Sequence, residues 1–214
     1  MDSFKYIDVN QNTDEWLSLR CGKLTSSNLG KIMANFGKSF GEPAKKLSVN
    51  IANEIITGNY IGSGFSNEHM QRGHIQEPLA RMEYEDFTFC EVDNGGFFES
   101  EFVGCSPDGL VDNSGVIEIK SVIPSVHFAN IKRQGIDPAY RWQCIGNLKF
   151  TGRDWLDFIS YCSDFPEGKK IFIHRIYKEN LSEEFSMIDK RLLEFKSLVY
   201  QNKKLIQESM YNNY

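Results

Sequence analysis

Residues 104–120 read GCSPDGLVDNSGVIEIK, and both the fold and the site are inferred from this pattern. Asp108 follows a proline and opens a short strand, a turn is expected at 112–115, and the chain then returns as a second strand. Side chains alternate between the two faces of a strand, so Glu118 and Lys120 share one face while the neighbouring isoleucines face the other way. Asp108 lies on the adjacent strand of this hairpin and can reach the same face as Glu118 and Lys120.

Two carboxylates and a lysine at one place are what metal-assisted hydrolysis of a phosphodiester requires. The oxygens of Asp108 and Glu118 suit Mg²⁺, or Mn²⁺ in its place, and the backbone carbonyl of Ile119 can add a ligand. The cation lowers the pKa of a bound water, and Lys120 can position or deprotonate that water or offset charge in the transition state. The pattern alone also fits a solvent-facing hairpin with a cross-strand salt bridge.

Helical periodicity and turn residues divide the rest of the chain into helices and short strands. Thr13 is expected to cap the first helix, and Asn180, with Glu183 three residues later, is expected to cap the last. The order of elements predicts a single domain, residues 1–214, with an α/β or α+β layer structure. Helices are expected at 13–20, 26–36, 43–57, 67–86, 124–133, 138–150 and 181–209, and strands at 87–92, 95–99, 102–105, 109–112, 115–120, 155–162 and 170–177.

The composition argues against several classes of protein. No apolar run is long enough for a membrane span and the N-terminus lacks a secretory apolar region, so we expect a cytoplasmic protein with no membrane partner. The five cysteines form no CxxC pair, which favours reduced thiols over disulfides or a zinc site. A net charge of −5 argues against a simple DNA-coating protein but not against a nuclease, whose metal-holding carboxylates add negative charge.

The expected helix 67–86 has two apolar stripes, and a carboxylate interrupts one of them. Burying an unpaired carboxylate is costly, so Glu77 is either exposed, paired with Arg81 or His74, or part of a metal site. One stripe consists of Ile75, Leu79 and Met82, and the stripe that contains Glu77 consists of Met70, Gly73, Ala80 and Tyr84.

Arg20 lies four residues after Trp16, so the two side chains share a helix face. A guanidinium group suits a terminal phosphate, and the hydroxyls of Thr25, Ser26 and Ser27 follow where a new helix is expected to begin and to favour anions. An ordinary surface arginine beside a helix cap would give the same pattern.

The segment 104–120 resembles the PD-(D/E)xK nuclease core and, more narrowly, the phage lambda exonuclease family, also called the YqaJ-type viral recombinase family. Three further segments match that family in order: WLSLR at 16–20 followed by LTSS at 24–27, RGHIQE at 72–77, and YRWQ at 140–143. The resemblance implies a central mixed β-sheet flanked by helices, the restriction-endonuclease-like core.

The resemblance also implies an activity and its partners. It implies Mg²⁺-dependent digestion of one strand of linear double-stranded DNA from the 5′ end, with release of mononucleotides. It implies a ring-shaped homotrimer through which the DNA threads. The remaining 3′ single strands would pass to a phage-type single-strand annealing protein, so a phage or prophage origin in a bacterial cytosol is expected.

The same resemblance implies roles for individual residues. Arg20 and Ser27 would hold the 5′ phosphate, with the hydroxyl of Thr25 as a further substrate-binding candidate. Ser106 would contact phosphate, and Gln143 would lie in the active site near the water that Lys120 serves. Glu77 would join the metal site, directly or through water.

Two alternatives to an exonuclease remain at this stage. A structure-specific or site-specific endonuclease would use the same core, and a non-catalytic DNA-binding protein could retain it in degenerate form. The match at Arg20 and Ser27 favours recognition of a DNA end over internal cleavage. The presence of Asp108, Glu118 and Lys120 together argues against degeneracy.

Overall fold

The computed structural model describes residues 4–62 and 68–209, apart from the side chains of residues 68–71 and 74. The expectations for residue 67 and for the side chains of Met70 and His74 therefore lie outside the described residues. The helices are α1 (Asp14–Arg20), α2 (Leu29–Met33), α3 (Glu42–Thr57), α4 (Glu68–Thr88), α5 (Pro124–Arg133), α6 (Arg141–Thr151) and α7 (Ser182–Glu208), with the 3₁₀ turns η1 (Ser26–Asn28) and η2 (Lys178–Asn180).

The strands form two mixed sheets rather than one. The four-stranded sheet has the order β1-β4-β5-β2, and the five-stranded sheet has the order β3-β6-β7-β8-β9. The strands are β1 (Lys5–Ile7), β2 (Leu24–Thr25), β3 (Val92–Asp93), β4 (Phe97–Glu99), β5 (Val103–Cys105), β6 (Gly109–Val111), β7 (Gly115–Ser121), β8 (Trp155–Tyr161) and β9 (Ile171–Tyr177). The expected mixed α+β class is confirmed. The first two strands of the chain, β1 and β2, were not expected from the sequence.

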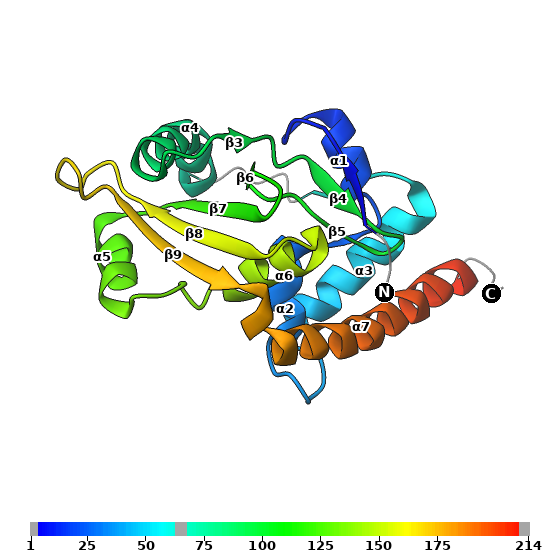
Figure 1. The fold of residues 1–214 in the computed structure, drawn as a ribbon. Helices are drawn as coiled ribbons and strands as arrows, with labels where there is room; N and C mark the ends of the chain where they lie inside the picture. The colour runs from blue at the N-terminus through cyan, green and yellow to red at the C-terminus, as the bar shows by residue number, and fades with distance from the viewer. Residues whose placement is uncertain (1–3, 63–67, 210–214) are drawn as a thin grey trace.

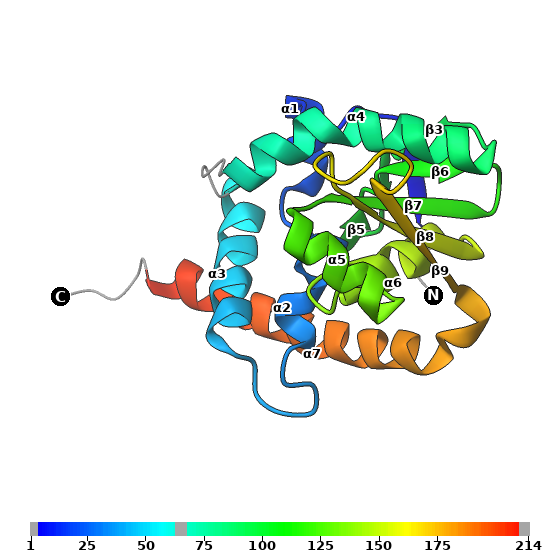
Figure 2. The ribbon, with the colours of Figure 1, turned by 90° about the vertical axis from the view of Figure 1, so that its left-hand side faces the viewer.

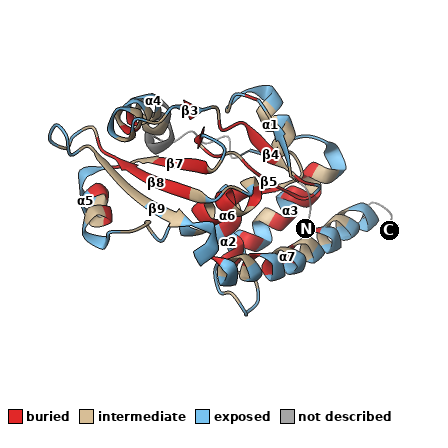
Figure 3. Cartoon of the chain, in the orientation of Figure 1, coloured by how far each residue is buried: buried red, intermediate tan, exposed pale blue. Residues whose placement is uncertain are grey.

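Helices cover both faces of the five-stranded sheet (Figures 1 and 2). On one face, Ile117 and Ile119 of β7 pack in a cluster with Ala80 and Tyr84 of α4. On the other face, Val116 joins a cluster that includes residues of α6. Helices α2, α3 and α7 lie beyond α6, so α6 and strands β7 and β8 form the buried centre of the molecule (Figure 3). The alternation expected along β7 is confirmed.

Strand β7 is longer than its neighbour β6, and this difference leaves an open edge at the site. Strand β7 pairs with parallel β8 along its whole length, but antiparallel β6 pairs only with residues 115–117 of β7. Residues 118–121 therefore have no β6 partner on that side. The backbone N–H and C=O groups that point to this edge can form hydrogen bonds with side chains instead. In the second sheet, parallel pairing of Thr25 with Gly104 brings the 24–27 segment beside the segment that leads to Asp108.

Several local expectations were wrong. The segment 87–92 is not a strand, because α4 continues through Thr88 and only Val92–Asp93 pair with β6. The expected helix 26–36 is a 3₁₀ turn followed by a short helix that ends at Met33. Asn180 does not cap α7: it lies in η2, and the cap position belongs to the buried Leu181.

The remaining expectations can be compared directly with the structure. Thr13 caps α1, because its hydroxyl accepts a hydrogen bond from the Trp16 N–H. The stripe of Ile75, Leu79 and Met82 is exposed, whereas Ala80 and Tyr84 are buried. All five cysteines are free thiols. None of the helices in the described part of the chain has the length and apolar character that crossing a membrane requires.

Candidate active site

Asp108 stands at the open edge of β7, where the β6–β7 hairpin begins. Its N–H donates to the Ile117 carbonyl at 3.1 Å, and its Oδ2 accepts from the Ile119 N–H at 2.6 Å. The N–H and C=O of one strand residue point to the same edge, so the Ile119 carbonyl also faces the side on which Asp108 lies. The hairpin therefore directs a carboxylate and a backbone carbonyl to one place.

Glu118 is fully buried and both of its carboxylate oxygens are hydrogen-bonded. Oε1 accepts from the Lys120 ammonium and from Gln143 Nε2, the latter at 2.5 Å. Oε2 accepts from Asn147 Nδ2 at 2.6 Å. Gln143 and Asn147 lie four residues apart on α6, so one face of that helix presents two amides to the same carboxylate.

Lys120 completes this group as a protonated cation. Its ammonium contacts Glu118 and lies 5.2 Å from the centre of the Tyr140 ring, and 21% of its side chain is exposed. Burial lowers the pKa of Lys120, but the Glu118 and Asp108 carboxylates outweigh burial and hold that pKa above its ordinary value. The lysine is thus suited to stabilise negative charge or to orient water, and less suited to remove a proton as a base.

Glu77 reaches the same region from α4. Glu77 and Asp108 line one open pocket of about 270 Å³, together with Gln11 and Arg81. Burial and the Asp108 charge raise the pKa of Glu77 to about 7, although Lys120 and Arg81 oppose the shift. The sequence left open that the Glu77 side chain is simply exposed to solvent. The structure excludes this, because Glu77 is only partly exposed.

The three carboxylates fit a divalent cation by their chemistry. Burial and Asp108 raise the pKa of Glu118 to about 8, and burial also raises the pKa of Asp108. Lys120 and Arg81 together leave these three acids short of positive charge, which a hard cation with oxygen ligands would supply. As the side chains stand, no three His, Cys, Asp or Glu residues in the described segments are placed to hold one metal ion. Binding would therefore require Glu118 Oε1 to exchange Lys120 and Gln143 for the cation, while Oε2 can keep its bond from Asn147.

We expect Asp108→Asn to stabilise the metal-free protein at pH 8. The pKa values of Glu77 and Glu118 are raised on folding, so the folded state keeps protons that the unfolded state loses between about pH 4.5 and 8. Stability should fall as the pH rises through this window, and removal of the Asp108 charge should reduce the fall. One pKa unit corresponds to about 1.4 kcal/mol, and 1 kcal/mol shifts the Tm of a chain of this size by about 2–4 °C, so a gain of a few degrees is expected.

The measurement is the Tm of both proteins in chelator at pH 5 and pH 8. Comparing the variant with the wild type cancels the titration of the shared groups that Asp108 does not influence, and leaves the effect of Asp108 on Glu77 and Glu118. A gain in Tm that is as large at pH 5 as at pH 8 would show that charge repulsion at Asp108 is not its cause.

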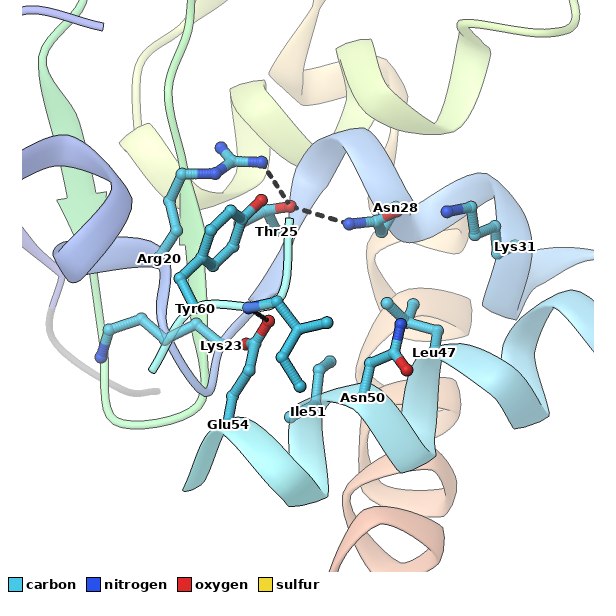
Figure 4. A pocket seen from close by; sticks show the side chains of 11 residues that line it. Arg20, Lys23, Thr25, Asn28, Lys31, Leu47, Asn50, Ile51, Glu54 and Tyr60 are labelled. Carbon is cyan, nitrogen blue, oxygen red and sulfur yellow. Dashed lines mark hydrogen bonds between the residues drawn. The ribbon is translucent and has the colours of Figure 1, made fainter. Parts of the chain in front are cut away.

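A second group of polar side chains lies at the start of η1, on a pocket of about 140 Å³ (Figure 4). The Arg20 guanidinium stacks over the Trp16 ring at 4.1 Å and donates to Thr25 Oγ1 at 3.4 Å. Thr25 and Ser27 share a hydrogen bond of 3.0 Å, and the Ser27 side chain is exposed. Arg20 Nε is buried and has no hydrogen-bond partner within residues 4–62 and 68–209. The structure therefore brings Arg20, Thr25 and Ser27 together.

Ser106 connects the two groups through Trp16. Its hydroxyl accepts from the indole Nε1 of Trp16 at 2.8 Å and donates to the Gly96 carbonyl at 2.5 Å. The adjacent Gly95 allows this packing, because a Cβ there would lie 1.7 Å from the Pro107 carbonyl oxygen. Ser106 thus holds the ring on which Arg20 stacks.

The sequence did not predict two polar residues that contact the site. Asn147 donates to Glu118, and its spacing of four residues from Gln143 was the signal that could have identified it. Gln11, whose amide donates to the Pro107 carbonyl at 3.0 Å, precedes the first helix and had no recognisable pattern.

Comparison with known proteins gives a consistent family. The family described as YqaJ-like viral recombinase domain matches residues 15–154, and no functionally curated protein matches the chain. The structure is similar to that of LHK-Exo, an alkaline exonuclease from Laribacter hongkongensis, with a TM-score of 0.75 and 28% identity over 92% of this chain and 99% of that one. The complex of LHK-Exo with dAMP gives a TM-score of 0.77 and 29% identity over the same shares of the two chains.

A more distant structure has the same fold. A phage-related exonuclease from Haemophilus somnus 129PT gives a TM-score of 0.65 at 16% identity over 87% of this chain and 96% of that one. The family match spans 140 of the 214 residues and contains both groups of polar side chains described above. With more than half of its length matched, the chain belongs to the YqaJ-like viral recombinase domain family.

Proposed function

We propose that this protein is a metal-dependent exonuclease that degrades one strand of linear double-stranded DNA from its 5′ end to mononucleotides. The observation that supports this most is the pairing of a carboxylate–lysine centre, Asp108, Glu118 and Lys120, with the cationic group at Arg20. The similarity to LHK-Exo, which is an alkaline exonuclease and was solved with dAMP, supports the same class of reaction and of product.

In the proposed mechanism, Asp108, Glu118 and the Ile119 carbonyl would hold Mg²⁺, or Mn²⁺ in its place, with Glu77 contributing directly or through water. The cation would supply positive charge that polarises the scissile phosphodiester. Lys120, whose ammonium contacts Glu118, would stabilise the charge that develops on the phosphoryl oxygens or orient the attacking water. Gln143, whose amide is hydrogen-bonded to Glu118, would lie beside the cation site and orient the attacking water.

The Arg20 group would select the DNA end. A terminal phosphate monoester carries more charge than an internal diester, and a guanidinium fixed on the Trp16 ring can bind it through two N–H groups. The hydroxyls of Thr25 and Ser27 would complete the contacts, with Ser106 holding Trp16 in place. This assignment distinguishes an exonuclease from an endonuclease with the same core.

We further propose that the chain is a single domain that works as a homotrimer in the bacterial cytosol and passes 3′ single strands to an annealing protein. Family membership supports the role in recombination that these proposals describe. The exposed stripe of Ile75, Leu79 and Met82 on α4 is an apolar surface of the kind that contact with another copy would cover.

The test is digestion of a linear duplex that carries its label on one strand, at either the 5′ or the 3′ end. With Mg²⁺ present, the 5′ label should appear at once as a mononucleotide, while the 3′ label remains in a long single strand. Chelator should prevent release of the 5′ label. Early release of the 3′ label would contradict the proposed polarity, and labelled oligonucleotides of fixed length would indicate an endonuclease.

A further inference from the structure

A buried chain of hydrogen bonds joins the two groups of polar side chains. Ser26, which lies between Thr25 and Ser27, donates its hydroxyl hydrogen to Asn147 Oδ1. Asn147 in turn donates from Nδ2 to Glu118 Oε2 at 2.6 Å. All three residues of this chain, Ser26, Asn147 and Glu118, are buried, with exposed fractions of 3%, 0% and 0%. Burying three polar side chains is costly unless each is satisfied, so the chain acts as one unit.

The chemistry of the three groups fixes the orientation of the Asn147 amide. When Glu118 is ionised, as a bound cation would keep it, its carboxylate only accepts hydrogen bonds, so the amide nitrogen faces Glu118 and the amide oxygen faces Ser26. The Ser26 hydroxyl can rotate to donate to that oxygen. A turn of the amide would place its oxygen against the Glu118 carboxylate, and this repulsion excludes the alternative.

Close packing of α6 on η1 maintains the chain. Gly146 faces this contact: a Cβ there would lie 2.2 Å from Leu29 Cδ1 and 3.2 Å from Ser26 Cβ. The absence of a side chain at Gly146 thus lets the adjacent Asn147 reach Ser26. Only two hydrogen bonds, Ser26–Asn147 and Asn147–Glu118, separate the 25–27 turn from Glu118.

We propose that Asn147 is a positioning residue that couples the 25–27 turn to Glu118, so that a terminal phosphate held by Thr25 and Ser27 raises kcat and not only affinity. This inference rests on the proposed function, since it assigns the 25–27 turn to the 5′ phosphate. It adds that Ser26, although buried, determines how strongly the binding of that end raises kcat.

The test compares steady-state kinetics on 5′-phosphorylated and 5′-hydroxyl linear duplexes, together with the dissociation constant of each duplex in chelator and the Tm. The variants are Asn147→Ala and Ser26→Ala. Matched controls are Asn130→Ala and Ser48→Ala, because both residues are fully buried and hydrogen-bonded but do not contact Glu118. Asn147→Leu keeps the side-chain volume without a donor, and serves if the alanine variant fails to fold.

Asn147→Ala should lower kcat by about 10- to 100-fold on both duplexes, the range for loss of a hydrogen bond to a charged group, with unchanged affinity in chelator. Ser26→Ala should reduce the ratio of kcat between the two duplexes while leaving the ratio of their dissociation constants as in the wild type.

Two results would overturn the inference while the proposed function stands. One is a loss of kcat in the Asn147 variants no larger than in Asn130→Ala, and the other is an unchanged kcat ratio in Ser26→Ala. Inactivity of the wild type on both duplexes with Mg²⁺ would instead overturn the proposed function and this inference with it.

Discussion

Replacement of Lys120 by alanine is expected to lower kcat by about 10²–10³-fold or more, the usual effect of removing one group that stabilises transition-state charge. The reason lies in the surroundings of the ammonium, which contacts Glu118 and is kept protonated by Glu118 and Asp108. Loss of Lys120 removes that positive charge and also leaves the two carboxylates without their nearest cation.

The measurement is kcat on a linear duplex with saturating Mg²⁺, with circular dichroism to verify folding. Lys170→Ala is a matched control: Lys170 also pairs with a glutamate and is 23% exposed, against 21% for Lys120, but it lies in the β8–β9 connection. That variant should keep wild-type activity. Near-full activity of Lys120→Ala would show that the catalytic centre lies elsewhere.

The second large effect concerns the DNA end. We expect a 5′-phosphorylated duplex to be degraded about 10- to 100-fold faster than a 5′-hydroxyl duplex, the range for a hydrogen bond to a charged group expressed at the transition state. Arg20→Ala should remove most of this difference, because the buried Nε of Arg20 and its stacking on Trp16 prepare the guanidinium for a phosphate. Arg20→Lys should rescue only in part, since lysine restores the charge but not the planar fork.

The two substrates must be compared at one salt concentration, because binding to the DNA backbone changes steeply with ionic strength. Arg141→Ala is the control, since Arg141 also lies over a tryptophan ring, at 5.6 Å from Trp142, but pairs with Glu184 at the surface. An unchanged preference in Arg20→Ala would transfer the end-recognition role to other residues, with Ser27 the next candidate.

The hairpin that carries Asp108, Glu118 and Lys120 was predictable because its pattern is local. A two-residue alternation places Glu118 and Lys120 on one face, and a short turn brings Asp108 to the same edge. The structure has this arrangement, with the Ile119 N–H bonded to Asp108. Gln143 was identified only by resemblance to a family, and the structure places its amide on Glu118.

The features that the sequence did not predict depend on contacts between distant segments. Strand β2 exists only because Leu24–Thr25 pair with β5, about eighty positions later, and two residues give no periodicity to detect. The polar chain from Ser26 to Asn147 joins positions 121 residues apart in the sequence. Tertiary packing also overrode local preference where α4 extends through Thr88, in a segment whose aromatic residues favoured a strand.

The most direct test of the central claim is incubation of the protein with linear and with covalently closed circular duplexes of the same sequence, each with Mg²⁺ and with chelator. If Asp108, Glu118 and Lys120 form a metal-dependent centre that acts from a DNA end bound at Arg20, only the linear duplex with Mg²⁺ will be degraded. Cleavage of the closed circle would show an endonuclease, and an intact linear duplex with Mg²⁺ would show that the protein does not cleave DNA from an end.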